Sequence, residues 1–87
     1  NIEKIKISGI TDDINIKITD ISGNLIAEAN SNVNNRYNGF NLEIDGGVAY
    51  WNGKNLANNS VSSGVYIVML SDLDSYETKI LKIMIIR

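Results

Sequence analysis

Side chains that could carry catalysis or hold a metal are scarce in this chain. Histidine and cysteine are both absent, which excludes Ser–His–Asp catalysis and a structural zinc site. No glycine cluster opens a helix, so a phosphate-binding loop is not expected. Carboxylates, hydroxyls and amides remain, and we expect neither enzymatic activity nor a cofactor.

Only one acidic group approaches the spacing of a metal site. Asp72, Asp74 and Glu77 flank a single turn, and hard oxygen ligands this close together could hold calcium. Their spacing does not match an EF-hand loop, and Asp is a favoured turn residue in its own right. We interpret the group as a solvated hairpin turn and predict no metal site.

The aromatic residues allow two interpretations. Phe40, Tyr50, Trp51 and Tyr66 could form a platform on which a sugar stacks, the usual sign of a carbohydrate-binding module. They also stand beside apolar neighbours, where rings more commonly pack in a core. Trp51 is the most plausible platform residue, because it ends a strand directly before the turn expected at Gly53.

The elements that must position these residues are β-strands. Apolar and polar residues alternate with the period of two that is typical of half-buried strands, and turn residues separate the runs. We expect about seven strands, near residues 4–7, 14–19, 25–29, 40–45, 48–51, 65–70 and 76–87. No segment has helical periodicity. The chain is therefore predicted to be one all-β domain, an immunoglobulin-like two-sheet sandwich over residues 1–87, with a small open barrel as the alternative.

Two apolar runs differ from this alternation. Val65–Leu70 is apolar on both faces, which suits a central strand covered on both sides. The terminal run, Lys82, Ile83, Met84, Ile85, Ile86 and Arg87, also has apolar groups on both faces. One interpretation is a second central strand, and the other is a strand whose edge or second face is offered to a partner.

Composition excludes further classes of function. The net charge is −2, and Lys and Arg are scattered singly, so no nucleic-acid-binding face is expected. Apolar runs are far shorter than the roughly 20 residues of a transmembrane helix. The chain opens Asn-Ile-Glu-Lys without an initiator methionine, and we interpret it as a processed piece of a longer protein.

Three motifs together resemble the C-terminal sorting domains of the type IX secretion system of Bacteroidetes. They are the hairpin Ile18-Thr19-Asp20-Ile21-Ser22-Gly23-Asn24-Leu25-Ile26, the strand start Ser63-Gly64-Val65-Tyr66-Ile67-Val68, and the closing basic and apolar strand, residues 79–87. Tyr50-Trp51-Asn52-Gly53-Lys54-Asn55, followed by the second motif, is also similar to the immunoglobulin-like module of the flagellar hook-capping scaffold. Sorting domains often open with an Asn-Pro pair, whereas proline is absent here. The chain is therefore also similar to a C-terminal module that is kept on its protein, such as the one that ends the propeller-bearing component of the attachment complex.

The resemblance implies a recognition signal carried by a folded domain. Lys82 to Arg87 would be recognised by secretion or attachment machinery, while Gly23 and Gly64, together with Gly53, would shape turns. The protein would pass through the periplasm and then be secreted or held at the outer-membrane surface. The alternatives are a carbohydrate- or ligand-binding sandwich appended to an enzyme or sensor, with Trp51 as its platform, and a structural spacer between domains.

Overall fold

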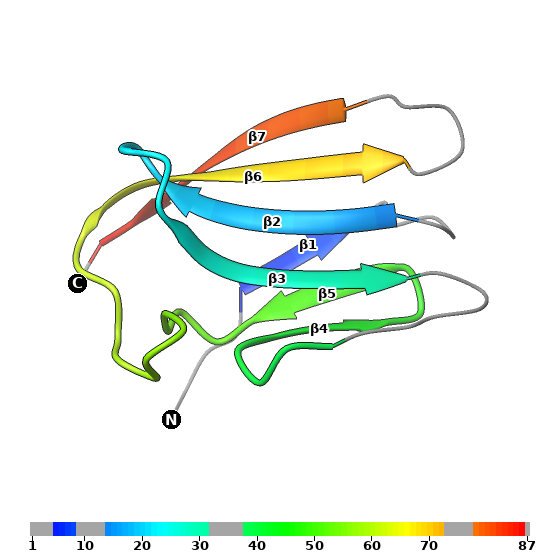
Figure 1. The fold of residues 1–87 in the computed structure, drawn as a ribbon, viewed down its shortest axis with the longest axis horizontal. Helices are drawn as coiled ribbons and strands as arrows, with labels where there is room; N and C mark the ends of the chain where they lie inside the picture. Colours follow the sequence, from blue (N-terminus) through cyan, green and yellow to red (C-terminus); the bar gives the residue numbers. More distant parts are fainter. Residues whose placement is uncertain (1–4, 9–13, 32–37, 73–77, 87) are drawn as a thin grey trace.

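The chain forms seven strands and no helix among the residues that the structure describes. A computed structural model describes residues 5–8, 14–31, 38–72 and 78–86 (Figure 1). The strands are β1 (Ile5–Ser8), β2 (Ile14–Asp20), β3 (Leu25–Ser31), β4 (Leu42–Asp45), β5 (Val48–Trp51), β6 (Gly64–Asp72) and β7 (Thr78–Ile85). Over these residues, no helix is present that could cross a membrane.

The strands make two antiparallel sheets packed face to face. One sheet has the order β1-β5-β4 and the other the order β3-β2-β6-β7. These orders match strands B-E-D and C′-C-F-G of an immunoglobulin-like domain, with each hairpin and crossover in the corresponding place. The predicted two-sheet sandwich is confirmed, and the two sheets do not close into a barrel.

Alternation of apolar residues determines which face of each strand enters the core. Ile14, Ile16 and Ile18 on β2 are buried, as predicted, and across the ladders Ile16 and Ile18 face buried residues of both β3 and β6. The full core cluster consists of Ile7, Ile14, Ile16, Ile18, Ile26, Ala27, Ala29, Leu42, Ile44, Ala49, Trp51, Val61, Tyr66, Val68 and Leu70. Burial of this apolar surface is the main driving force that holds the sheets together.

A tyrosine at the start of β6 supports the immunoglobulin-like assignment. The Tyr66 hydroxyl donates a hydrogen bond of 2.7 Å to the backbone carbonyl of Ser62, four residues upstream. This is the arrangement of the tyrosine corner, which immunoglobulin-like sandwiches place at the start of strand F. The motif Ser63-Gly64-Val65-Tyr66 therefore carries a structural feature of the fold.

Asn41 closes one side of the sandwich. Its amide donates hydrogen bonds of 2.9 Å to the carbonyls of Ile26 on β3 and Lys54 after β5, so it joins the two sheets. Ile26 is the extra residue of a β-bulge, because Ile18 pairs with Ala27 and Thr19 with Leu25. A bulge leaves its extra residue outside the ladder, and Asn41 supplies the donor that this carbonyl needs.

Two sequence expectations are wrong in detail. The alternation predicted to begin at Phe40 begins at Leu42: Phe40 is 62% exposed and Asn41 only 2%. The reason is a turn, in which the Leu42 amide bonds the Gly39 carbonyl, so residues 40 and 41 do not follow the strand period. The run Val65–Leu70 does lie in a central strand, but its outer face is only half-buried and not covered by a second layer.

Candidate functional site

The C-terminal strand β7 lies at a free edge of the larger sheet. Among the strands that the structure describes, its only neighbour in the sheet is β6, and the pairing runs from Ser71↔Thr78 to Gly64↔Ile85 without a register shift. Figure 1 shows β7 as the upper border of the sandwich. The interpretation of the terminal run as a central strand buried on both sides is therefore wrong, since only one of its edges is paired.

Apolar side chains on β7 are unusually exposed. Ile80 is 63% exposed, Met84 67%, and Ile86, directly after the strand, 82%. Ile83 and Ile85 are half-buried and pack against the core. The strand is therefore anchored by Ile83 and Ile85 in its C-terminal half, while Ile80 and Met84 face outward on the uncovered face.

The exposed residues of β7 continue onto β6. Met84 pairs with Val65 and Ile80 pairs with Met69, and paired residues share one face of a sheet. Val65 and Met69 are half-buried. We call these residues, Val65, Met69, Ile80 and Met84, the outer patch. Lys82, paired with Ile67, lies between Ile80 and Met84 on this face, and apolar side chains gathered on one face in this way are typical of interaction surfaces.

A groove lies on the inner side of β7, where the smaller sheet does not reach it. The groove has a volume of about 340 Å³ and is lined by Lys6, Ile7, Ser8, Val68, Leu81, Lys82 and Ile83. Lys6, Ile7 and Ser8 belong to β1, which is the edge strand of the other sheet. The sandwich is thus open between β1 and β7, in contrast to the side that Asn41 closes.

Basic and acidic side chains lie on opposite sides of the sandwich, the basic ones on the open side between β1 and β7 and the acidic ones on the side of β3 and β4. On β1 and β7 the described residues include Lys6, Lys79 and Lys82 and no acidic residue. On β3 and β4 they include only acidic groups, namely Glu28, Glu43 and Asp45. A chain with a net charge of −2 therefore presents a basic side at the open groove and an acidic side opposite.

The predicted recognition residues fall on this basic, open side. Lys82, Ile83, Met84 and Ile85 belong to β7, and Ile86 follows it. Arg87 lies outside the described residues. Sequence reasoning included these positions but missed Ile80, which is 63% exposed, and Leu81, which is 44% exposed. Both belong to the terminal strand expected over residues 76–87, whose apolar groups lie on both faces, and this pattern could have identified them.

Trp51 cannot act as the ligand platform that the sequence suggested. Its side chain has no exposed surface, and its ring packs edge to face against Tyr66 with centroids 5.7 Å apart. The indole N–H donates to the Lys54 carbonyl at 3.0 Å, which satisfies the polar atom of a buried ring. This interpretation is therefore corrected, and the alternative, that Trp51 and Tyr66 belong to the core, is confirmed.

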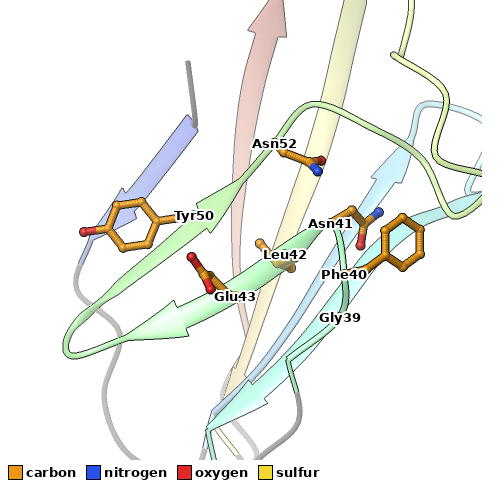
Figure 2. Close-up of a pocket in the computed structure, with 7 residues that line it drawn as sticks. All are labelled: Gly39, Phe40, Asn41, Leu42, Glu43, Tyr50 and Asn52. Carbon is orange, nitrogen blue, oxygen red and sulfur yellow. The ribbon is translucent and has the colours of Figure 1, made fainter. Parts of the chain in front are cut away.

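A small pocket lies beside β4 and β5. It has a volume of about 90 Å³ and is lined by Gly39, Phe40, Asn41, Leu42, Glu43, Tyr50 and Asn52. Figure 2 shows Phe40 and Tyr50 at opposite ends of this pocket, so the two rings do not form one stacking surface. Ligand pockets for small molecules are usually several hundred Å³, and this one is too small to hold a sugar ring.

Two of the three predicted turn glycines have the conformation that requires glycine. Gly23 has a φ of 90° and Gly53 a φ of 77°, in the left-handed region that other residues rarely adopt. Gly64 is different: it is the first residue of β6 and has no positive φ. A Cβ added at Gly64 would meet no atom within 4 Å, so the structure gives no steric reason for glycine at this position.

The hairpin between β2 and β3 is organised by Asp20. The carboxylate accepts hydrogen bonds of 2.9 Å from the backbone amides of Ser22 and Asn24 and one of 3.0 Å from the Asn24 side chain. The Asn24 side chain, followed by the backbone donors, lowers the pKa of Asp20 below its usual value. This carboxylate has a structural function, because its lone pairs are used within the turn.

No group of three or more potential metal-ligating side chains occurs within residues 5–8, 14–31, 38–72 and 78–86. Asp74 and Glu77 of the turn that was weighed as a calcium site lie outside these ranges.

The comparisons with known proteins agree with the resemblance read from the motifs. No protein-family model matches the chain, and no curated protein is significantly similar to it. One solved structure is similar, that of PorZ, described as an essential bacterial surface component of the type IX secretion system of Porphyromonas gingivalis. The TM-score is 0.71 and the sequence identity 28% over 94% of this chain.

The match covers almost all of this chain but only a small part of PorZ. The chain spans 9% of the length of PorZ, so the similarity concerns one domain of a much longer protein. The similarity in fold extends over almost all of the 87 residues, with about a quarter of the aligned residues identical. The chain is thus similar to an immunoglobulin-like domain within a component of the type IX secretion system.

Proposed function

We propose that this chain is a non-catalytic targeting or attachment module of the type IX secretion system. In this proposal it forms the C-terminal module of a larger protein and is recognised for translocation across the outer membrane or for attachment at the surface. The observation that carries the proposal is the similarity to PorZ in both fold and sequence over 94% of the chain.

The proposed recognition element is the end of β7, residues 82–87. Its support is the exposure of Met84 and Ile86, the free edge of the strand and the lysine side chains beside it. A partner that covers Met84 and Ile86 would remove exposed apolar surface from water, which is the largest favourable contribution to most protein association. The proposed partners are proteins of the secretion or attachment machinery.

The location that follows from this proposal is outside the cytoplasm. The protein would be present in the periplasm during transit and afterwards at the outer-membrane surface or in the medium. Its own upstream domains would be the cargo or the functional part that the module delivers. Catalysis is assigned to none of the residues of this chain.

The proposal is tested by fusing the 87-residue chain behind a periplasmic reporter in a host with a working type IX system. Three variants are compared with the parent: removal of residues 83–87, and the single substitutions Met84→Glu and Ile86→Glu. The substitutions are needed because Ile83 and Ile85 pack against the core, and truncation can reduce folding. Ile21→Glu is the matched control, since Ile21 is 75% exposed in the turn between β2 and β3.

We expect Met84→Glu and Ile86→Glu to reduce the surface or secreted reporter while Ile21→Glu leaves it unchanged. Circular dichroism of the purified fusions establishes that each variant is folded. Unchanged export of both folded glutamate variants would refute the assignment of recognition to the end of β7. Reporter retained in the periplasm with the parent domain would refute autonomous targeting.

A further inference from the structure

The free edge of β7 has a backbone that can bind another strand. An edge strand of an antiparallel sheet directs every second residue's N–H and C=O away from its neighbour. On β7 these groups extend over eight residues that pair with β6 without a bulge. Within the described ranges, no other strand pairs with this edge.

The other long edge of the same sheet is protected. The outer edge of β3 lies beside β4, and Asn41 donates to the Ile26 carbonyl at its bulge. On β7, neither a proline nor a bulge interrupts the strand. Protein edges are commonly protected by bulges, by prolines, by charged side chains or by a covering segment, and β7 has only its lysines. Of the two edges of the larger sheet, β7 is therefore the less protected.

The charges of β7 indicate which strand could bind there. Lys79 and Lys82 lie three positions apart, so one is on each face of the strand, and Lys6 lines the adjoining groove. Opposite charges directly across a ladder stabilise a sheet, whereas like charges destabilise it. A second copy that paired through its own β7 would offer no acidic side chain opposite these lysines, because β7 contains none, and this disfavours that arrangement.

We propose that the free edge of β7 is a strand-addition site for an extended protein segment with acidic side chains. The segment would extend the larger sheet by one strand and place carboxylates opposite Lys79 and Lys82. Apolar side chains between them would cover Leu81 in the groove and Met84 on the outer patch. This inference rests on the proposed function in taking β7 as the recognition element, and it adds the binding mode and the chemistry of the partner.

The test uses the 87-residue chain and two blocked peptides of the same length as β7. One peptide contains valine and threonine with two glutamates three positions apart, and the other has lysines in place of the glutamates. Binding is followed by NMR titration, and amide hydrogen exchange locates the bound strand. We expect the glutamate peptide to slow the exchange of alternate β7 amides and to bind more weakly as the salt concentration rises. The lysine peptide should bind at least about tenfold more weakly.

Charge reversal distinguishes strand addition from non-specific attraction. The double variant with Lys79→Glu and Lys82→Glu should prefer the lysine peptide, and it should fold because both side chains are exposed. Lys17→Glu on β2 is the control for charge reversal away from the edge: it reverses one lysine on the same sheet, opposite Glu28 of β3, and should retain the parent's preference.

Three results would overturn the inference. They are the absence of binding by the glutamate peptide, slowed exchange at β3 or β4 in place of β7, and protection of β7 that depends on protein concentration without peptide. The last would assign the edge to a second copy. Because this assay needs no secretion machinery, its failure is separate from a failure of the reporter assay, which tests the proposed function itself.

Discussion

Replacement of Asn41 by alanine should destabilise the domain far more than the loss of an ordinary surface asparagine. Asn41 is 2% exposed and donates hydrogen bonds to the carbonyls of Ile26 and Lys54. The Lys54 carbonyl keeps a second donor in Asn41→Ala, the indole N–H of Trp51 at 3.0 Å. The Ile26 carbonyl belongs to the residue left out of the ladder by the bulge, so it loses the donor that the side chain supplied.

The expected fall in the free energy of unfolding is the sum of the two losses at these carbonyls. Leaving a buried carbonyl without a donor costs about 1–3 kcal/mol, and losing one hydrogen bond to a carbonyl that keeps another costs about 0.5–1.5 kcal/mol. We therefore expect Asn41→Ala to lower the free energy of unfolding by about 2–4 kcal/mol. That is a large part of the roughly 5–15 kcal/mol that stabilises a typical domain.

The assay is equilibrium unfolding in urea followed by the fluorescence of Trp51, the single tryptophan, which is fully buried in the folded state. Asn55→Ala is the matched control, because Asn55 also makes two hydrogen bonds, to the amides of Ala57 and Asn59, but in an exposed loop. It should cost less than about 1 kcal/mol, since water replaces the lost acceptor. If Asn41→Ala lowered the free energy of unfolding by no more than Asn55→Ala does, the conclusion that Asn41 joins the two sheets would be refuted.

Three further predictions test the turns and the corner of the sandwich. Tyr66→Phe removes only the hydrogen bond to Ser62 and should cost about 1 kcal/mol, a fall in Tm of about 4–8 °C; an unchanged Tm would contradict the tyrosine corner. Gly23→Ala should destabilise by about 1 kcal/mol because of its positive φ, whereas Gly64→Ala should be neutral in the same urea titration; equal effects would contradict this difference. Asp20 has a lowered pKa in the folded state, so its stabilising contribution is present at neutral pH and is lost as the pH falls through that pKa. Asp20→Asn should therefore reduce the dependence of the urea midpoint on pH in the acidic range, and an unaltered dependence would contradict this role.

The strands and their buried faces were largely predictable from local pattern. Ile14, Ile16 and Ile18 alternate with polar residues, and the period of two is sufficient to place them in a core. The hairpin that follows was predictable for a related reason. The Asp20 side chain accepts hydrogen bonds from backbone amides of the turn, and Gly23 adopts the positive φ that the turn needs, so both residue types are typical of turns.

Asn41 shows where local pattern is insufficient. In the sequence it belongs to an Asn-rich polar stretch, and asparagine is usually exposed. Its burial depends on a bulge in β3 and on a carbonyl after β5, residues distant in the chain. The same turn exposes Phe40, which alternation had placed in the core.

The edge position of β7 was not predictable from the terminal run alone. Ile83 to Ile86 are apolar on both faces, which fits either a central strand or an exposed one. Strand order decides between them, and strand order depends on contacts between β2 and β6 that sequence periodicity does not encode. The choice between core and ligand platform for Trp51 could not be made from the sequence for a similar reason, because its indole N–H finds its acceptor in the Lys54 carbonyl within the folded loop.

The central claim is that this domain serves the type IX secretion system. The most direct measurement compares one fusion, the domain behind a periplasmic reporter, in two hosts that differ only in whether that system works. The quantity measured is the fraction of reporter at the cell surface or in the medium. Our account predicts a large fraction in the host with the working system and periplasmic retention in the other. Equal fractions in the two hosts would contradict it.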